Sequence, residues 1–166
     1  NIPNDLEATA VITDVSCNGL SDGGVTITAT GGSGVLTYEL ANTSVTNESG
    51  VFNNLAAGSY TILVSDRNSC SIAIDVDIDE PTLLIAEITS FEDVSCTGSS
   101  DGSATVNATG GTTGYSYAWP ASAGGQTTAT ATDLSAGSYE VTVTDANGCL
   151  ATVEATIGEP MPLDIT

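Results

Sequence analysis

Hydrophobic and polar residues alternate along several short stretches of the chain. Residues 25–30 alternate Val, Ile and Ala with Thr, and residues 72–78 alternate Ile and Val with Ala and Asp. A period of two is that of a β-strand with one buried face. Similar stretches cover 6–13, 36–40 and 60–66. Because no segment has the period of an amphipathic helix, the sequence predicts an all-β protein.

The whole pattern returns after 79 residues without a gap. The superposed segments are 14–17 (DVSC) with 93–96, 29–32 (ATGG) with 108–111, 57–60 (AGSY) with 136–139, and 80–81 (EP) with 159–160. Constant spacing over a whole unit identifies a tandem repeat. We therefore predict two domains, residues 1–80 and 81–166. In the second, residues 159–166 are expected to be the start of a further repeat or a polymerisation strand.

Clusters of Gly, Asn and Asp separate the predicted strands, as turns require. Six or seven short strands in a unit of about 79 residues are typical of an immunoglobulin-like β-sandwich. The expected fold is therefore two tandem immunoglobulin-like β-sandwich modules. Tyr60 and Tyr139 each stand at the opening of a late strand, as in the tyrosine corner of such sandwiches. Packing of both rings in the core is the alternative.

Each repeat carries one cysteine at its first turn and one in its last hairpin. Four cysteines permit three pairings. From the repeat phase we predict that Cys17 pairs with Cys70 and Cys96 with Cys149, so that each module closes on itself. Such a bond would stabilise a module by about 4 kcal/mol in the chain-entropy model. Disulfides also indicate an oxidising compartment, and a chain without His or C-x-x-C offers no zinc site.

The charge of the chain is extreme. It has 21 acidic residues against a single basic one, Arg67, for a formal net charge of −20. This excludes nucleic acid as a partner, and no run of about 18 apolar residues is present to insert into a membrane. Without His or Lys there is no imidazole base, no Ser-His-Asp arrangement and no Schiff-base amine. We therefore expect a protein that is not an enzyme and requires no cofactor.

Four aspartates recur at turns in identical phase: Asp22 and Asp101 before a Gly, and Asp66 and Asp145 before the second cysteine of each module. Carboxylate and carbonyl oxygens at one end of a sandwich suit calcium, which takes six to eight oxygen ligands. Asp is also a preferred turn residue, because its side chain accepts hydrogen bonds from following amides. Calcium is thus the one candidate metal, with turn chemistry as the alternative.

The remaining acidic residues fall into two groups. The outward row of one strand is expected to be a solvated face that deters pairing between molecules, and it comprises Asp75, Asp77, Asp79 and Glu80. The other group lies near the predicted junctions, where bound cations would rigidify them, and comprises Asp5, Glu7, Asp14, Glu92 and Asp93.

Several motifs of the first copy occur together in one known family. They are VSCNG at 15–19, DG at 22–23, TGG at 30–32, AGSY at 57–60, DRNSC at 66–70 and EP at 80–81. The second copy adds YSYAW at 115–119 and TDANGC at 144–149. Over its whole length the chain resembles the SprB-type repeat of Bacteroidota cell-surface adhesins, some of which serve gliding motility. The first copy departs from that pattern at Glu39-Leu40 and at Ser69.

The resemblance implies type IX secretion, an extracellular position on the cell surface and adhesion as the broad role. Our main hypothesis is a disulfide-stiffened stalk that displays a binding surface, with neighbouring repeats, other copies of the chain, or a surface polysaccharide or protein as partners. One alternative is a filament that assembles head to tail by addition of the strand at 162–166. A second is carbohydrate binding by Tyr115, Tyr117 and Trp119, although their alternation favours the core.

Overall fold

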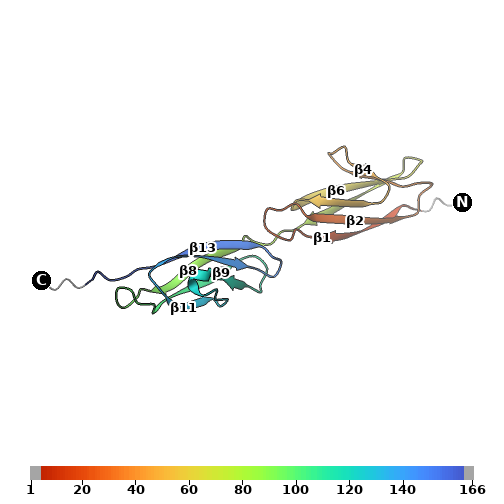
Figure 1. Ribbon diagram of the computed structural model, residues 1–166. Coiled ribbons are helices and arrows are strands. Elements are labelled where there is room, and N and C mark those ends of the chain that lie inside the picture. Colours follow the sequence, from red (N-terminus) through yellow and green to blue (C-terminus); the bar gives the residue numbers. More distant parts are fainter. Residues whose placement is uncertain (1–4, 163–166) are drawn as a thin grey trace. The chain divides into compact units, whose positions relative to one another are not determined.

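A computed structural model describes residues 5–162 of the chain. The chain forms two compact units, one up to Pro81 and one from Thr82. The boundary lies one residue beyond the position expected from the repeat. Each unit is a sandwich of two antiparallel sheets (Figure 1), and the predicted all-β, immunoglobulin-like fold is confirmed.

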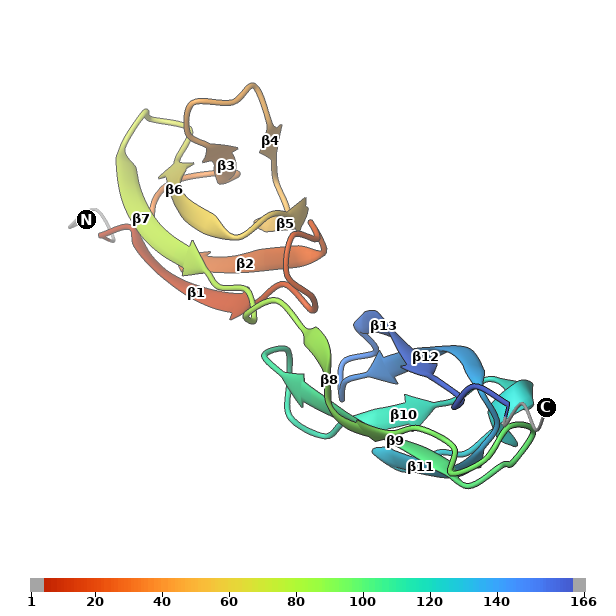
Figure 2. The same ribbon diagram turned by 90° about the vertical axis from the view of Figure 1, so that its left-hand side faces the viewer.

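The described part of the first module, from residue 5 onward, contains seven strands. They are β1 (Glu7–Thr13), β2 (Gly23–Thr30), β3 (Thr37–Leu40), β4 (Thr46–Asn47), β5 (Val51–Leu55), β6 (Gly58–Ser65) and β7 (Ser71–Ile78). One sheet has the order β1-β2-β5 and the other the order β4-β3-β6-β7. The two layers face each other in Figure 2. The sequence pattern had not marked β4 and β5, because neither of these short strands shows clear alternation.

The second module repeats this plan with one local change. Its elements are β8 (Ile85–Glu92), β9 (Gly102–Thr109), β10 (Ser116–Ala118), the 3-10 turn η1 (Ala121–Ala123), β11 (Thr130–Leu134), β12 (Gly137–Thr144) and β13 (Leu150–Ile157). The sheet orders are β11-β9-β8 and β10-β12-β13. The turn η1 follows Pro120 and ends at Gly124, whose φ of 75° is left-handed.

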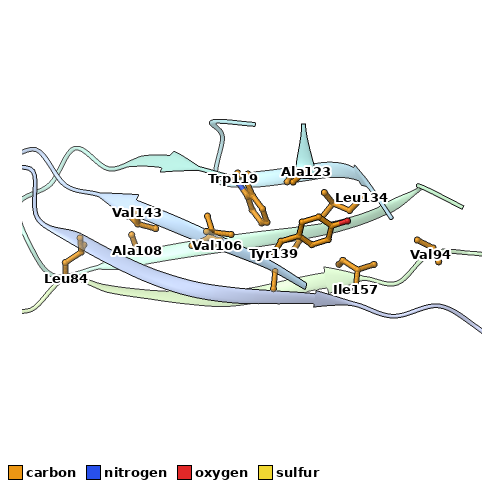
Figure 3. Close-up of a cluster of buried hydrophobic side chains, with 14 residues drawn as sticks. Leu84, Val94, Val106, Ala108, Trp119, Ala123, Leu134, Tyr139, Val143 and Ile157 are labelled. Carbon is orange, nitrogen blue, oxygen red and sulfur yellow. The ribbon is translucent and has the colours of Figure 1, made fainter. Parts of the chain in front are cut away.

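Each module has a hydrophobic core of its own. In the first, Val25 and Ile27 of β2 face inward while Thr26 and Thr28 face solvent. In the second, buried side chains of both sheets surround Trp119 and Tyr139 (Figure 3). The indole Nε1 of Trp119 donates to the carbonyl of Thr128 at 2.9 Å. Each buried cluster draws its residues from one module alone.

Both late-strand tyrosines form the tyrosine corner that the sequence suggested. The Tyr60 hydroxyl donates to the Ala56 carbonyl at 3.0 Å, and that of Tyr139 to the Ser135 carbonyl at 2.8 Å. Each bond ties the start of β6 or β12 to the loop that precedes it. The tyrosines therefore pack in the core and also fix a corner.

Truncation of one core residue should weaken the second module alone. Leu134 is 1% exposed, so Leu134→Ala should lower the free energy of unfolding of that module by about 2–5 kcal/mol. Trp119, the only tryptophan, lies in this core and reports its unfolding by fluorescence in a urea titration.

The matched control is Leu150→Ala in the same module, where the leucine is 67% exposed and the change should be below about 0.5 kcal/mol. Circular dichroism should still show the transition of the first module unmoved in both variants. A parallel loss of both modules in Leu134→Ala would contradict the separation of the cores.

Candidate functional site: the two ends of each module

Most of the repeated motifs lie at the two ends of each module. The chain enters a module at its leading end, where β1 or β8 begins, and leaves at its trailing end, where β7 or β13 finishes. The leading ends comprise residues 31–34 and 66–70 in the first module, and 110–113 and 145–149 in the second. The trailing ends comprise 14–22 and 79–81 in the first module, and 93–101 and 158–160 in the second.

The Glu-Pro motif packs against the trailing end of its own module. The amide of Gly19 donates to Glu80 Oε2 at 2.6 Å, and the amide of Gly98 donates to Glu159 Oε2 at 3.2 Å. The hydroxyl of Thr97 also donates to the carbonyl of Pro160 at 2.8 Å. Glu80 therefore fixes a turn at the trailing end of the first module.

These contacts correct part of the prediction for residues 159–166. Glu159 and Pro160 belong to the second module by their hydrogen bonds and do not begin a further one. The equal phase of the Glu-Pro pairs in the sequence had suggested a junction, whereas each pair closes the module that precedes it. Residues 163–166 lie outside the described part of the chain.

Asp22 and Asp101 hold the first turn at the trailing ends. Asp22 accepts hydrogen bonds from the amide and the hydroxyl of Ser16, and Asp101 accepts from the amide of Ser95 at 3.0 Å. The serine bonds lower the pKa of both carboxyls below its ordinary value. The glycine after each aspartate is required by space: at Gly23 an added Cβ would lie 2.8 Å from Ile78 Cγ2.

A second aspartate of the trailing end joins the first strand to the last. In the first module the Val15 amide donates to the Asp79 carbonyl at 2.9 Å, and the Asp79 amide donates back to Asp14 Oδ1 at 3.0 Å. In the second module the Gly158 amide donates to Asp93 Oδ1 at 2.7 Å. Because β1 and β7 belong to different sheets, this clasp closes the sandwich at one edge.

The leading end is built around Asp145 in the second module. Its Oδ1 accepts from the amides of Asn147 and Cys149, both at 2.9 Å, and its Oδ2 accepts from the amide of Thr112 at 2.8 Å. The Thr112 bond is the main cause of a lowered pKa. Asp145 is only 5% exposed, and it is the one charged side chain buried among residues 5–162.

Asp66 has the same role in the first module. It accepts from the amides of Asn68 at 2.9 Å, Cys70 at 2.8 Å and Ser33 at 3.0 Å. Three amides on two separate turns thus converge on one carboxylate, and this arrangement binds the β6–β7 hairpin to the turn after β2.

The four aspartates of the calcium prediction are therefore occupied by backbone amides. Asp22 and Asp66 lie at opposite ends of their module, so they do not contribute to one site, and the same is true of Asp101 and Asp145. Residues 5–162 contain no group of three or more Asp, Glu, Cys or His side chains placed to hold a metal ion. Calcium binding stays a prediction, and the geometry favours turn chemistry.

The outward acidic row of β7 is partly hydrogen bonded. The hydroxyl of Thr61 donates to Asp75 at 2.6 Å and that of Ser59 to Asp77 at 2.5 Å. These carboxylates thereby support the pairing of β6 with β7 while they remain exposed to solvent. Cross-strand pairs of this kind stabilise a sheet face.

The predicted pairing of cysteines within each module is wrong. Cys70 and Cys96 are free and exposed, while Cys17 and Cys149 each take part in a disulfide. Cys17 lies in the turn beside the finish of β7, whereas Cys70 immediately precedes its start. The eight residues of β7 span roughly 25 Å, and a disulfide requires Cα atoms within about 7 Å.

The same geometry separates Cys96 from Cys149, which lie at opposite ends of β13. The repeat shows that both modules carry cysteines at the same two sequence positions. It does not show at which end of the folded module each of these cysteines lies. The direction of the last strand decides that question.

The aromatic residues of the carbohydrate hypothesis lie inward. Trp119 is buried, and Tyr115 and Tyr117 pack against the same core. The Tyr115 hydroxyl donates to the Gly110 carbonyl at 2.6 Å. None of the three rings forms an exposed platform on which a sugar would stack.

The sandwich fold with tied ends defines the chain as an array of immunoglobulin-like modules. The family model described as SprB repeat matches it twice, at residues 9–50 and 88–124. One match lies in each module, so each module is similar to an SprB repeat, and this similarity supports a repeat region of the extracellular adhesin-like type. In the part of the chain that the structure describes, no helix has the length and apolar character to cross a bilayer.

No curated protein matches the sequence. Among solved structures, a 282-residue C-terminal fragment of intimin in complex with the intimin-binding domain of its translocated receptor is 15% identical, with a TM-score of 0.46, over 92% of this chain and 63% of that one. A Dscam structure is 15% identical, with a TM-score of 0.36, over 95% and 47%. Fibronectin(III)-like modules of Clostridium thermocellum CbhA are 11% identical, with a TM-score of 0.33, over 91% and 95%.

Replacement of the buried carboxylate by an amide should loosen the leading end. Asp145→Asn keeps the shape of the side chain but retains only one oxygen, so the amide of Thr112 would face an NH₂ group. We expect the thermal midpoint of the second module to fall by on the order of 10 °C. Asp133→Asn is the control, because Asp133 is exposed and Asn tolerates its left-handed φ of 57°.

The effect of Asp145→Asn should depend on pH. Since the pKa of Asp145 is lowered from 3.8, its stabilising contribution is complete above that value and is lost as the pH falls through the lower folded pKa. The difference in midpoint between wild type and variant should therefore be constant from neutral pH to about 5 and shrink below about 4. A difference that grows in acid would contradict the assigned hydrogen bonds.

Peptide mapping under non-reducing conditions tests the corrected cysteine assignment. In the folded monomer we expect neither a Cys17–Cys70 nor a Cys96–Cys149 bond, because each pair is separated by the length of a strand. A thiol-alkylating reagent should label Cys70 and Cys96 without denaturant. Recovery of either bond within a module would mean that the assigned course of the last strand is wrong.

Proposed function

We propose that the chain is a stalk segment of a cell-surface adhesin, in which successive modules hold a binding surface away from the cell. The observation that carries this proposal is the course of the chain through each module. It enters at the leading end and leaves at the opposite, trailing end, so every module adds its own length to an array. Modules with both termini at one end would not do so.

The connection between modules supports the same role. The carbonyl of Pro81 accepts a hydrogen bond from the Asn18 side chain of the first module at 3.1 Å. The carbonyl of Thr82, the next residue, accepts from the amide of Gly111 of the second module at 2.8 Å. Consecutive residues are thus each bonded to a different module, so the connection between the modules is short, and the reach of a linker is set by its length and composition.

The surface chemistry also suits a stalk. A net charge of −20 makes copies and modules repel one another, which favours solubility and an extended arrangement. The carboxylates that fix the turns contribute to that charge, so stability and mutual repulsion come from the same residues. A surface polysaccharide or protein is the proposed partner of the display, and the family alone supports that part.

The filament alternative depends on residues beyond Pro162 and stays a prediction. Carbohydrate binding by the aromatic residues is not favoured by any observation, because all three rings face the core.

Small-angle X-ray scattering tests the stalk. The maximum dimension of the whole chain should be about twice that of the second module alone, because in a stalk each module adds its own length. Insertion of a Gly-Ser segment between Pro81 and Thr82 should broaden the distance distribution. The same segment inserted in the exposed loop at 42–45 is the control and should leave the distribution of the wild type unchanged. A wild-type chain no longer than one module would refute the stalk.

A further inference from the structure

Two cysteines of the chain have free thiols, one at a leading end and the other at a trailing end. Cys70 lies in the leading end of the first module, and Cys96 in the trailing end of the second. Both are exposed. Free, exposed thiols are unusual in a chain whose other cysteines are oxidised, since the same compartment oxidises all accessible pairs.

The repeat supplies an independent observation about both positions. Cys96 is the equivalent of Cys17, and Cys70 is the equivalent of Cys149, at the spacing of 79 residues. Both equivalents take part in a disulfide. The turn at each of the two positions is thus able to present a cysteine that forms a disulfide. The oxidised cysteines are Cys17 at a trailing end and Cys149 at a leading end. The free cysteines are likewise one at a trailing end, Cys96, and one at a leading end, Cys70.

The turns that carry the free thiols are held firmly. The amide of Cys70 donates to Asp66, and the amide of Asp66 donates to the Cys70 carbonyl at 2.9 Å. In the second module the turn after Cys96 is tied to Glu159. Both thiols are therefore presented from fixed positions, which reduces the entropy lost when a bond forms between two molecules.

The charges around the two thiols are complementary. Arg67, the only basic residue of the chain, is exposed in the same hairpin as Cys70. The trailing end around Cys96 instead carries the exposed carboxylates of Asp93, Asp101 and Glu159. A leading end with a cation and a trailing end with carboxylates attract each other despite the net charge of the chain.

Cys96 is also accessible to a partner. It lines an open hollow of about 460 Å³ together with Ser95, Thr97, Pro160, Met161 and Pro162. Apolar side chains form part of that lining, and Met161 is 92% exposed. A hairpin tip that approaches this end would reach the thiol and cover apolar surface at the same time.

We propose that Cys96 of one copy forms a disulfide with Cys70 of a second copy, joining a trailing end to a leading end. The inference rests on the proposed stalk, and it moves the stiffening bonds from within modules to the contacts between successive ones. Because the two bonded positions differ, a joined pair of copies still offers one free thiol of each kind, Cys70 on one copy and Cys96 on the other. A heterologous contact of this type extends into a linear chain rather than closing a dimer.

The chemistry balances with a small disulfide as oxidant. The thiolate of Cys96 attacks oxidised glutathione, forming a mixed disulfide and releasing one glutathione thiolate. The thiolate of Cys70 from the second copy then attacks the Cys96 sulfur and releases the second glutathione. Two protein thiols lose two protons and two electrons in total, and one small disulfide is reduced to two thiols.

The test is oxidation of the whole chain in a glutathione buffer, followed by a non-reducing gel and peptide mapping. We expect a ladder of covalent oligomers that collapses to monomer on reduction, with Cys70–Cys96 as the intermolecular bond. In Cys70→Ser or Cys96→Ser alone the ladder should be lost, because growth needs both thiols. A mixture of these two variants should give a heterodimer in excess over both homodimers.

Two further variants separate specific docking from random oxidation. Adding Ser49→Cys to Cys70→Ser supplies an exposed thiol elsewhere on the first module and should not restore the ladder. Arg67→Glu should slow oligomer formation severalfold at low salt, with little effect at high salt.

A monomer that persists after oxidation would overturn the inference. Equal yields of Cys70–Cys70, Cys96–Cys96 and Cys70–Cys96 bonds would overturn it too, since they would indicate random encounter. The stalk is judged separately on the Cys70→Ser/Cys96→Ser double variant, whose scattering dimensions do not depend on cross-linking. An extended double variant with no ladder in the wild type removes only this inference, whereas a compact one removes the stalk.

Discussion

Aspartate carboxylates that accept backbone amides hold this protein together at its ends. Asp66 and Asp145 each accept hydrogen bonds from three amides on two turns. Asp14 in the first module and Asp93 in the second each tie the first strand of their module to its last. A sandwich of about 80 residues buries a small core and is marginally stable. Fixed turns therefore carry a larger share of its stability than they would in a larger domain.

This use of carboxylates connects composition with architecture. Much of the acidic excess appears in repeated turns rather than in a binding cluster, because an ionised carboxylate is the side chain that accepts several amides at once. The same groups give the array its negative charge. The proposed stalk needs folded, mutually repelling modules, and one residue type would supply both properties.

The placement of cysteines follows from the direction of the strands. A module whose chain enters and leaves at opposite ends puts its first turn and its last hairpin at opposite ends as well. Cysteines at those two positions lie too far apart to close their own module. Under the proposed bond between Cys96 and Cys70, the stiffening would lie between successive copies instead of within each unit.

The sequence by itself determined the repeat, its phase and the β-sandwich class, because strand alternation and turn residues are local properties. It also indicated Tyr60 and Tyr139 as corner residues, since their motif is local. Only the tertiary structure decided which groups meet: that Glu80 and Glu159 close their own modules, that Asp22 and Asp66 are occupied by amides at separate ends, and that Cys17 and Cys70 do not approach each other. Those facts depend on how strands of two sheets are ordered and directed in space, and a linear pattern with a period of two carries no information on that arrangement.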